Sequence, residues 1–119
     1  MLPDHLKDLL QHPDVCFEQP LNGCYIEVND AATNETLAWV KSLDRQAVEQ
    51  VIARSQAAQT TWKAQTALQR ADVLWAWYNL MLQNKEQLAQ ILTAEQGKPL
   101  AEARGEIGYA ASFIRWFAE

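Results

Sequence analysis

Apolar residues recur every three or four positions over most of the second half of the chain, and this spacing predicts amphipathic helices. Asp44 is a good N-cap, and apolar positions continue at this spacing to about residue 62. Thr66 and Gln69 form a capping box that opens a second run, which ends near Asn84. The pattern therefore predicts two long helices in succession.

A sharp bend is predicted near residue 97. Apolar positions resume after Asn84 and stop at Gly97, a residue that readily takes the left-handed conformation that closes a helix. Lys98 places a positive charge beside the last carbonyl groups of that helix, and Pro99 suits the first turn of the next one. We therefore expect a helix, a stop and a new helix over residues 100–118.

The predicted last helix is apolar on two faces. One face consists of Leu100, Ala103, Ile107, Ala110, Ala111, Ile114 and Phe117, and the other consists of Tyr109, Phe113 and Trp116. A helix of this kind needs neighbours on two sides. Gly105 and Gly108 suggest that another backbone approaches closely. Because the pattern continues to Glu119 without a C-cap, we interpret the end of the chain as a truncation.

The first third of the chain is less regular. Residues 3–11 are typical of a short amphipathic helix. Residues 25–28 and 36–40 alternate between apolar and polar side chains like strands, with turn-forming residues between them. Residues 25–41 are therefore interpreted as one antiparallel hairpin. Since two strands alone are only marginally stable in water, the hairpin must lie on helices or join other strands.

Length and composition agree with a small folded protein. A chain of 119 residues allows one domain with a modest core, and 49% hydrophobic against 21% charged residues excludes a disordered chain. The fold class expected is mainly α with one β-hairpin. The whole chain is treated as a single partial domain with three parts: residues 1–24, the hairpin 25–41 and the helices 44–119.

The charge balance excludes several partners. A net charge of −5 gives no basic surface for nucleic acid or an anionic membrane. No apolar run approaches the roughly 20 residues that span a bilayer, and no signal peptide begins the chain, so we expect a cytoplasmic protein. Cys16 and Cys24 are too few for a disulfide framework and lack the spacing of a metal or redox motif.

No self-contained active site is predicted. His5 and His12 lack acidic or cysteine partners for a metal, and neither a dinucleotide-binding nor a phosphate-binding glycine motif is present. Glu102 and Glu106 lie one helical turn apart and suit either an acid–base pair or a solvated helix face. We therefore assign no catalytic, cofactor-binding or metal-binding residue to this chain.

Tryptophan is unusually frequent for this length. The five tryptophans are Trp39, Trp62, Trp75, Trp77 and Trp116. Such rings need a large surface to pack against. They indicate either an aromatic core or a face that meets a partner, and the sequence leaves both open.

The residues at the bend resemble the NAD(P)-dependent aldehyde dehydrogenase superfamily, most closely its succinate-semialdehyde dehydrogenase branch. Residues 93–99, TAEQGKP, look like that branch's T-x-E-Q-G-K-P, and residues 100–119 continue the similarity. Upstream, residues 28–35, VNDAATNE, are similar to the family's V-x-N-P-A-T-G-E turn, with Asn34 in the place of glycine. Residues 1–24 diverge from the family.

The resemblance implies an N-terminal segment of such an enzyme, namely the hairpin and helices that flank its dinucleotide-binding domain, without the dinucleotide-binding sheet. The parent would oxidise an aldehyde to a carboxylic acid by thiolate attack and hydride transfer to NAD or NADP. The family's catalytic cysteine, general-base glutamate and oxyanion asparagine have no counterpart in the matched residues, so the chain alone is expected to be inactive. Tyr109 and Phe113 become candidates for lining the aldehyde entrance, with core packing as the alternative.

Two kinds of partner follow from these expectations. The remainder of the dehydrogenase, or other subunits, would cover the apolar helix faces, and exposed faces would cause self-association of the isolated chain. The alternative to a dehydrogenase segment is a free-standing helical interaction module or a truncated gene product that binds a partner.

Overall fold

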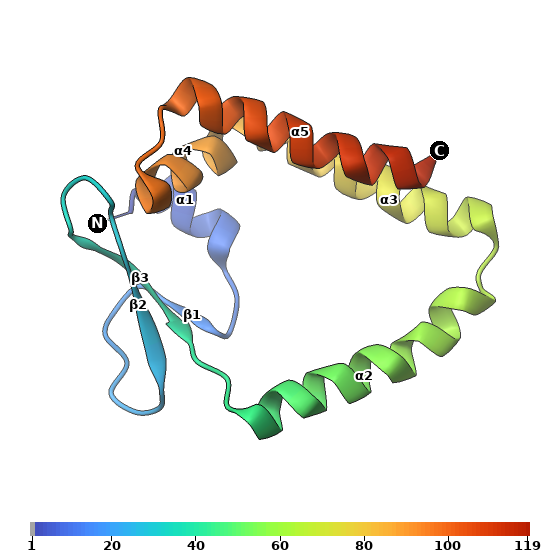
Figure 1. Ribbon diagram of the computed structural model, residues 1–119, viewed down its shortest axis with the longest axis horizontal. Coiled ribbons are helices and arrows are strands. Elements are labelled where there is room, and N and C mark those ends of the chain that lie inside the picture. Colours follow the sequence, from blue (N-terminus) through green and yellow to red (C-terminus); the bar gives the residue numbers. More distant parts are fainter. Residues whose placement is uncertain (1) are drawn as a thin grey trace. The chain divides into compact units, whose positions relative to one another are not determined.

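The computed structural model describes residues 2–119, which are mainly helical with one small antiparallel sheet (Figure 1). This confirms the expected fold class. The helices are α1 (Asp4–Lys7), the short 3₁₀ helix η1 (Asp8–Leu10), α2 (Arg45–Ala64), α3 (Ala67–Gln83), α4 (Lys85–Gln96) and α5 (Leu100–Ala118). The strands are β1 (Val15–Cys16), β2 (Tyr25–Asn29) and β3 (Thr36–Lys41).

The chain divides into two compact units. Unit 1 contains Met1–Ser42 and Asn84–Ile107, and unit 2 contains Leu43–Gln83 and Gly108–Glu119. The boundary falls inside α5, so unit 1 holds the start of that helix and unit 2 holds its end.

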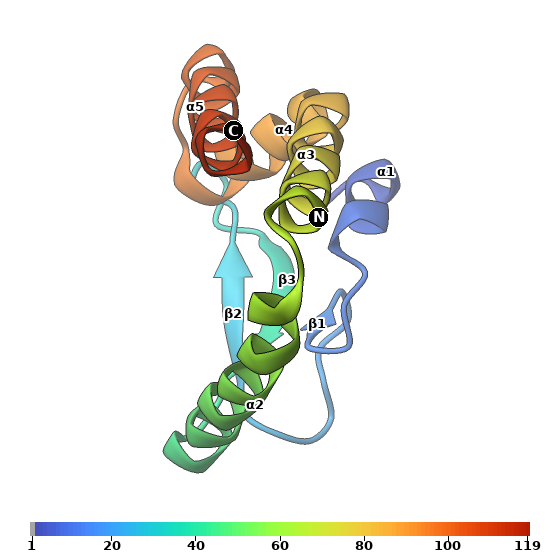
Figure 2. The same ribbon diagram turned by 90° about the vertical axis from the view of Figure 1, so that its right-hand side faces the viewer.

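The sheet of unit 1 has three strands, in the order β1-β3-β2 (Figure 2). The predicted hairpin is present as β2 and β3, with Tyr25 opposite Lys41 and Val28 opposite Ala38. The third strand, β1, pairs with the other edge of β3 and was not predicted. Two residues are too short to show an alternating pattern, so only the pairing reveals this strand.

The hairpin turn is held by its own polar side chains. The carboxylate of Asp30 accepts hydrogen bonds from the backbone N–H groups of Ala32, at 2.8 Å, and Thr33, at 2.9 Å. The hydrogen bonds from Thr33 and Ala32 hold the pKa of Asp30 below its usual value. Asn34 takes the left-handed conformation, with φ of 60°. Glycine takes this conformation at low steric cost, and Asn34 takes it in the place of glycine in this turn.

Unit 1 has a small apolar core. Leu2, Leu6 and Leu37 are its buried members. Partly buried side chains that pack against them are Leu10, Phe17, Val28, Ile91 and Ala94. The core thus joins α1, the sheet and α4.

The predicted bend is present at Gly97. This residue closes α4 with φ of 74°, and its N–H donates to the Thr93 carbonyl at 2.7 Å. The Pro99 carbonyl then accepts hydrogen bonds from the first turn of α5. The close backbone expected at Gly105 is not supplied by the described residues, because a Cβ atom built there meets no atom within 4 Å.

Unit 2 consists of α2, α3 and the end of α5, and both of its predicted caps are confirmed. Asp44 accepts a hydrogen bond from the Ala47 N–H at 2.8 Å, and Thr66 and Gln69 exchange side-chain and backbone hydrogen bonds at 2.9 and 3.2 Å.

No helix in residues 2–119 combines the length and apolar character needed to cross a membrane.

Candidate functional site

Tyr109 and Phe113, the two predicted site residues, lie one turn apart on the end of α5 in unit 2. Their ring centroids are 4.8 Å apart and their planes meet at 76°, an edge-to-face contact. Tyr109 is 67% exposed and Phe113 is 49% exposed. In this chain both rings therefore form part of the surface.

The two rings line a shallow, open hollow of about 690 Å³. Its lining residues are Tyr109, Ser112, Phe113, Arg115, Trp116, Phe117 and Glu119. All of them lie on α5 except Glu119, which directly follows it, so a single helix and its last neighbour supply only one wall. Ligand sites normally enclose most of a small molecule between several elements. This surface by itself does not enclose a ligand.

Arg115 and Glu119 form the polar part of this hollow. The Arg115 Nε donates to the Glu119 Oε1 at 2.9 Å. This hydrogen bond raises the pKa of Arg115 above its usual value. The pair satisfies both charges, so the hollow offers mainly aromatic surface. The helical spacing also placed Trp116 beside Tyr109 and Phe113, so sequence could have extended the predicted site to Trp116.

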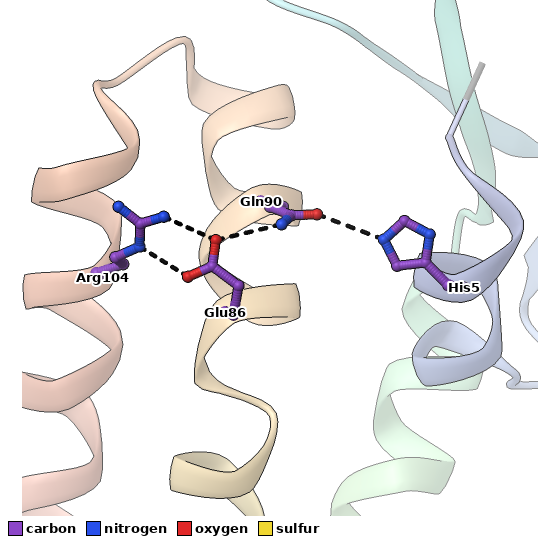
Figure 3. Close-up of polar contacts among 4 residues, drawn as sticks. All are labelled: His5, Glu86, Gln90 and Arg104. Atoms are coloured by element: carbon purple, nitrogen blue, oxygen red, sulfur yellow. Dashed lines mark hydrogen bonds and ion pairs between the residues drawn. The ribbon is translucent and has the colours of Figure 1, made fainter.

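A second polar arrangement lies in unit 1 (Figure 3). Arg104 on α5 donates from Nε to the Glu86 Oε2 at 2.7 Å and from Nη2 to the Glu86 Oε1 at 2.8 Å. Gln90 donates to the same Oε1 at 3.2 Å, and its own oxygen lies 3.5 Å from the His5 Nε2. These side chains connect α1, α4 and α5. No local sequence pattern marks the ion pair, because its members are 18 residues apart.

The Glu86 carboxylate is ionised near neutral pH and is paired with Arg104. Its hydrogen bonds from Arg104 and Gln90 lower its pKa to about 2. Glu106, one of the two predicted acid–base candidates, is paired with Lys98. The arrangement therefore gives these carboxylates cationic partners, which is typical of an ion-paired helix surface.

The other candidate ligands stand apart. Cys16 and Cys24 are free thiols. His12 lies beside Asp14, with 3.8 Å between the Nδ1 and the Oδ2. Across residues 2–119, no group of three or more His, Cys, Asp or Glu side chains is arranged to hold a metal ion.

Comparison with known proteins gives a consistent match. The model of the aldehyde dehydrogenase family matches residues 19–119. Glutarate-semialdehyde dehydrogenase of Pseudomonas aeruginosa and succinate-semialdehyde dehydrogenase [NADP(+)] GabD of Escherichia coli are each 46% identical over 98 residues. Those residues are 82% of this chain and 20% of each relative. The chain thus spans about one fifth of the length of these curated relatives.

Solved structures agree in fold. Succinate-semialdehyde dehydrogenase from Burkholderia pseudomallei superposes with a TM-score of 0.79 and 41% identity, covering 91% of this chain and 24% of that one. NADP-dependent glyceraldehyde-3-phosphate dehydrogenase from Bacillus halodurans was solved in complex with NADP. It superposes with a TM-score of 0.77 and 30% identity, covering 81% of this chain and 20% of that one.

The matched region includes both the hairpin and the Gly97 bend, and it extends through the aromatic end of α5. The structural agreement covers 91% of the chain. The chain therefore belongs to the aldehyde dehydrogenase family, as a segment homologous to the N-terminal part of its semialdehyde dehydrogenases.

Proposed function

We propose that this chain is the N-terminal segment of an NAD(P)-dependent semialdehyde dehydrogenase that oxidises an aldehyde to a carboxylic acid, and that the segment is inactive alone. The observation that carries the proposal is the 46% identity to two semialdehyde dehydrogenases over 98 residues. The incomplete hollow on α5 supports it, because one helix forms only one wall of a site.

The reaction belongs to the complete enzyme. The chemistry expected there is attack of a thiolate on the aldehyde carbon, followed by hydride transfer to the nicotinamide of NAD(P)+. The thiols of this chain, Cys16 and Cys24, lie in unit 1 and outside the hollow of unit 2. Tyr109 and Phe113 contribute an aromatic wall to the aldehyde entrance, and the cytoplasm is the proposed compartment.

Activity and mass measurements test this proposal. The purified chain of 13.5 kDa is mixed with succinate semialdehyde and NAD+ or NADP+, and absorbance at the wavelength of the reduced cofactor is followed. We expect no turnover above background. The intact mass of the product in its native cell is measured in parallel, and a mass several times larger, accompanied by turnover, supports the proposal. Turnover by the isolated chain contradicts it.

The aromatic wall has its own test in the longer enzyme. Tyr109→Ala and Phe113→Ala are expected to raise KM for the aldehyde by about fivefold to tenfold, with a smaller change in kcat, because each removes uniform binding. Tyr25→Ala, in the sheet of unit 1, is the matched aromatic control. Equal effects of the three substitutions on KM would show that Tyr109 and Phe113 have no special role.

A further inference from the structure

Asn22 is followed by glycine in the irregular loop between β1 and β2. The asparagines of the chain are Asn22, Asn29, Asn34, Asn79 and Asn84. Only the first of them precedes a glycine, and the pair lies in residues 17–24, which contain neither helix nor strand. Both residues of the pair are exposed. The side-chain amide and the following backbone nitrogen are therefore both accessible to solvent.

The backbone N–H of Gly23 is not held by a hydrogen bond. Among residues 2–119, neither this N–H nor the side chain of Asn22 has a hydrogen-bond partner. Gly23 takes φ of 100° and carries no Cβ atom beside its nitrogen. The glycine thus leaves its nitrogen open to the side-chain carbon of Asn22.

The other asparagines lack this combination. Asn34 is also exposed, but it precedes Glu35, whose N–H donates to the Thr33 Oγ1 at 3.3 Å. Asn29 ends β2, and its side-chain oxygen is buried. The remaining two are each followed by a residue of a helix, where the backbone dihedral angles are fixed. The five positions therefore provide their own internal comparison.

We propose that Asn22 is a site of spontaneous deamidation, a covalent modification whose only other reactant is water. The Gly23 nitrogen loses its proton to solvent and attacks the Asn22 Cγ, so that a nitrogen–carbon bond forms. The Cγ–Nδ2 bond breaks, and the side-chain nitrogen leaves as ammonia. The product is a five-membered imide. Water then cleaves either of its two carbon–nitrogen bonds and yields aspartate or isoaspartate at position 22, without oxidation or reduction.

The modification changes both charge and backbone at the entry to the sheet. Either product adds one negative charge to the net charge of −5. Isoaspartate also leads the main chain through the Cβ atom, which lengthens it just before Cys24. The Cys24 carbonyl accepts a hydrogen bond from the Ser42 N–H at 2.8 Å. The site therefore lies directly before the pairing of β2 with β3, and it is independent of the proposed function.

Incubation of the purified 119-residue chain in water enriched in oxygen-18 tests the proposal. We expect a gain of one negative charge in isoelectric focusing, release of one ammonia per chain, and one oxygen-18 atom in the new carboxyl group. Digestion in ordinary water then leaves any later deamidation unlabelled. Trypsin releases residues 8–41 as one peptide, because no lysine or arginine precedes its last residue. Tandem mass spectrometry of that peptide compares Asn22, Asn29 and Asn34 directly.

Two variants complete the test. Asn22→Gln should abolish the charge shift, because the longer side chain would have to close a six-membered imide. Asn79→Gln, at an exposed position of α3, is the matched control and should leave the shift unchanged. Three results would each overturn the proposal: no label at Asn22, equal labelling of Asn22 and Asn34, or an unchanged charge shift in the Asn22→Gln chain.

Discussion

Unit 1 and unit 2 both contain helices but differ in what their side chains touch. In unit 1, α1, α4 and the sheet share a core around Leu37, and the Glu86–Arg104 pair joins α4 to α5. In unit 2, Asp44 caps α2 and a capping box opens α3, yet neither helix contains a buried residue.

The difference teaches that local helix signals and burial are separate matters. Caps and spacing stabilise a helix by about 1 kcal/mol for each feature, whereas most helical stability in proteins comes from packing of an apolar face. Unit 1 has both contributions within this chain. Unit 2 has the local signals, but no side chain of α2 or α3 is fully buried.

The largest effect is expected in the core of unit 1. Leu37→Ala should lower the free energy of unfolding by about 2–4 kcal/mol, because Leu37 is 6% exposed and its loss leaves a cavity. Leu68→Ala in unit 2 should change it by less than about 0.5 kcal/mol, because Leu68 is 71% exposed. Urea unfolding monitored by amide hydrogen exchange in β3 provides the measurement. Similar losses for both variants would remove the contrast between the units.

A smaller effect is expected at the bend. Gly97→Ala should destabilise unit 1 by about 1–2 kcal/mol, since φ is 74° and the new Cβ would lie 3.1 Å from the Ala31 Cβ. Gly105→Ala should instead stabilise it by about 0.5–1 kcal/mol, because the site is helical and open. The two unfolding midpoints should shift in opposite directions. Shifts of the same sign would contradict this account of the two glycines.

The smallest effect concerns the ion pair and pH. The folded-state pKa of Glu86 is about 2, below its ordinary value of 4.5. Its contribution to stability is therefore fully present above about pH 4.5 and is lost as the pH falls toward 2. Glu86→Gln should reduce the change of the unfolding midpoint with pH between these two values. Glu49→Gln, at the exposed Arg45–Glu49 pair, should leave the pH dependence of the midpoint unchanged. Parallel profiles for the wild type and Glu86→Gln would show that this pair does not contribute.

Much of the fold could be predicted because its signals are local. The caps at Asp44 and Thr66, the left-handed Gly97 and the alternation of the hairpin each depend on residues within one turn or one strand. The family resemblance identified Tyr109 and Phe113 as candidates for lining the aldehyde entrance. Their spacing of one helical turn explains why their rings touch. Their role in binding remains a prediction.

What the sequence by itself determined was the order and ends of the helices, the hairpin and the family. Tertiary structure alone decided that β1 pairs with β3, that Arg104 binds Glu86, and which apolar residues are buried. These contacts join residues far apart in the chain, and no local preference specifies them. Tyr109, Phe113 and Trp116 on α5 show the reason most clearly. Their spacing along the helix is the same whether a neighbour covers them or leaves them exposed.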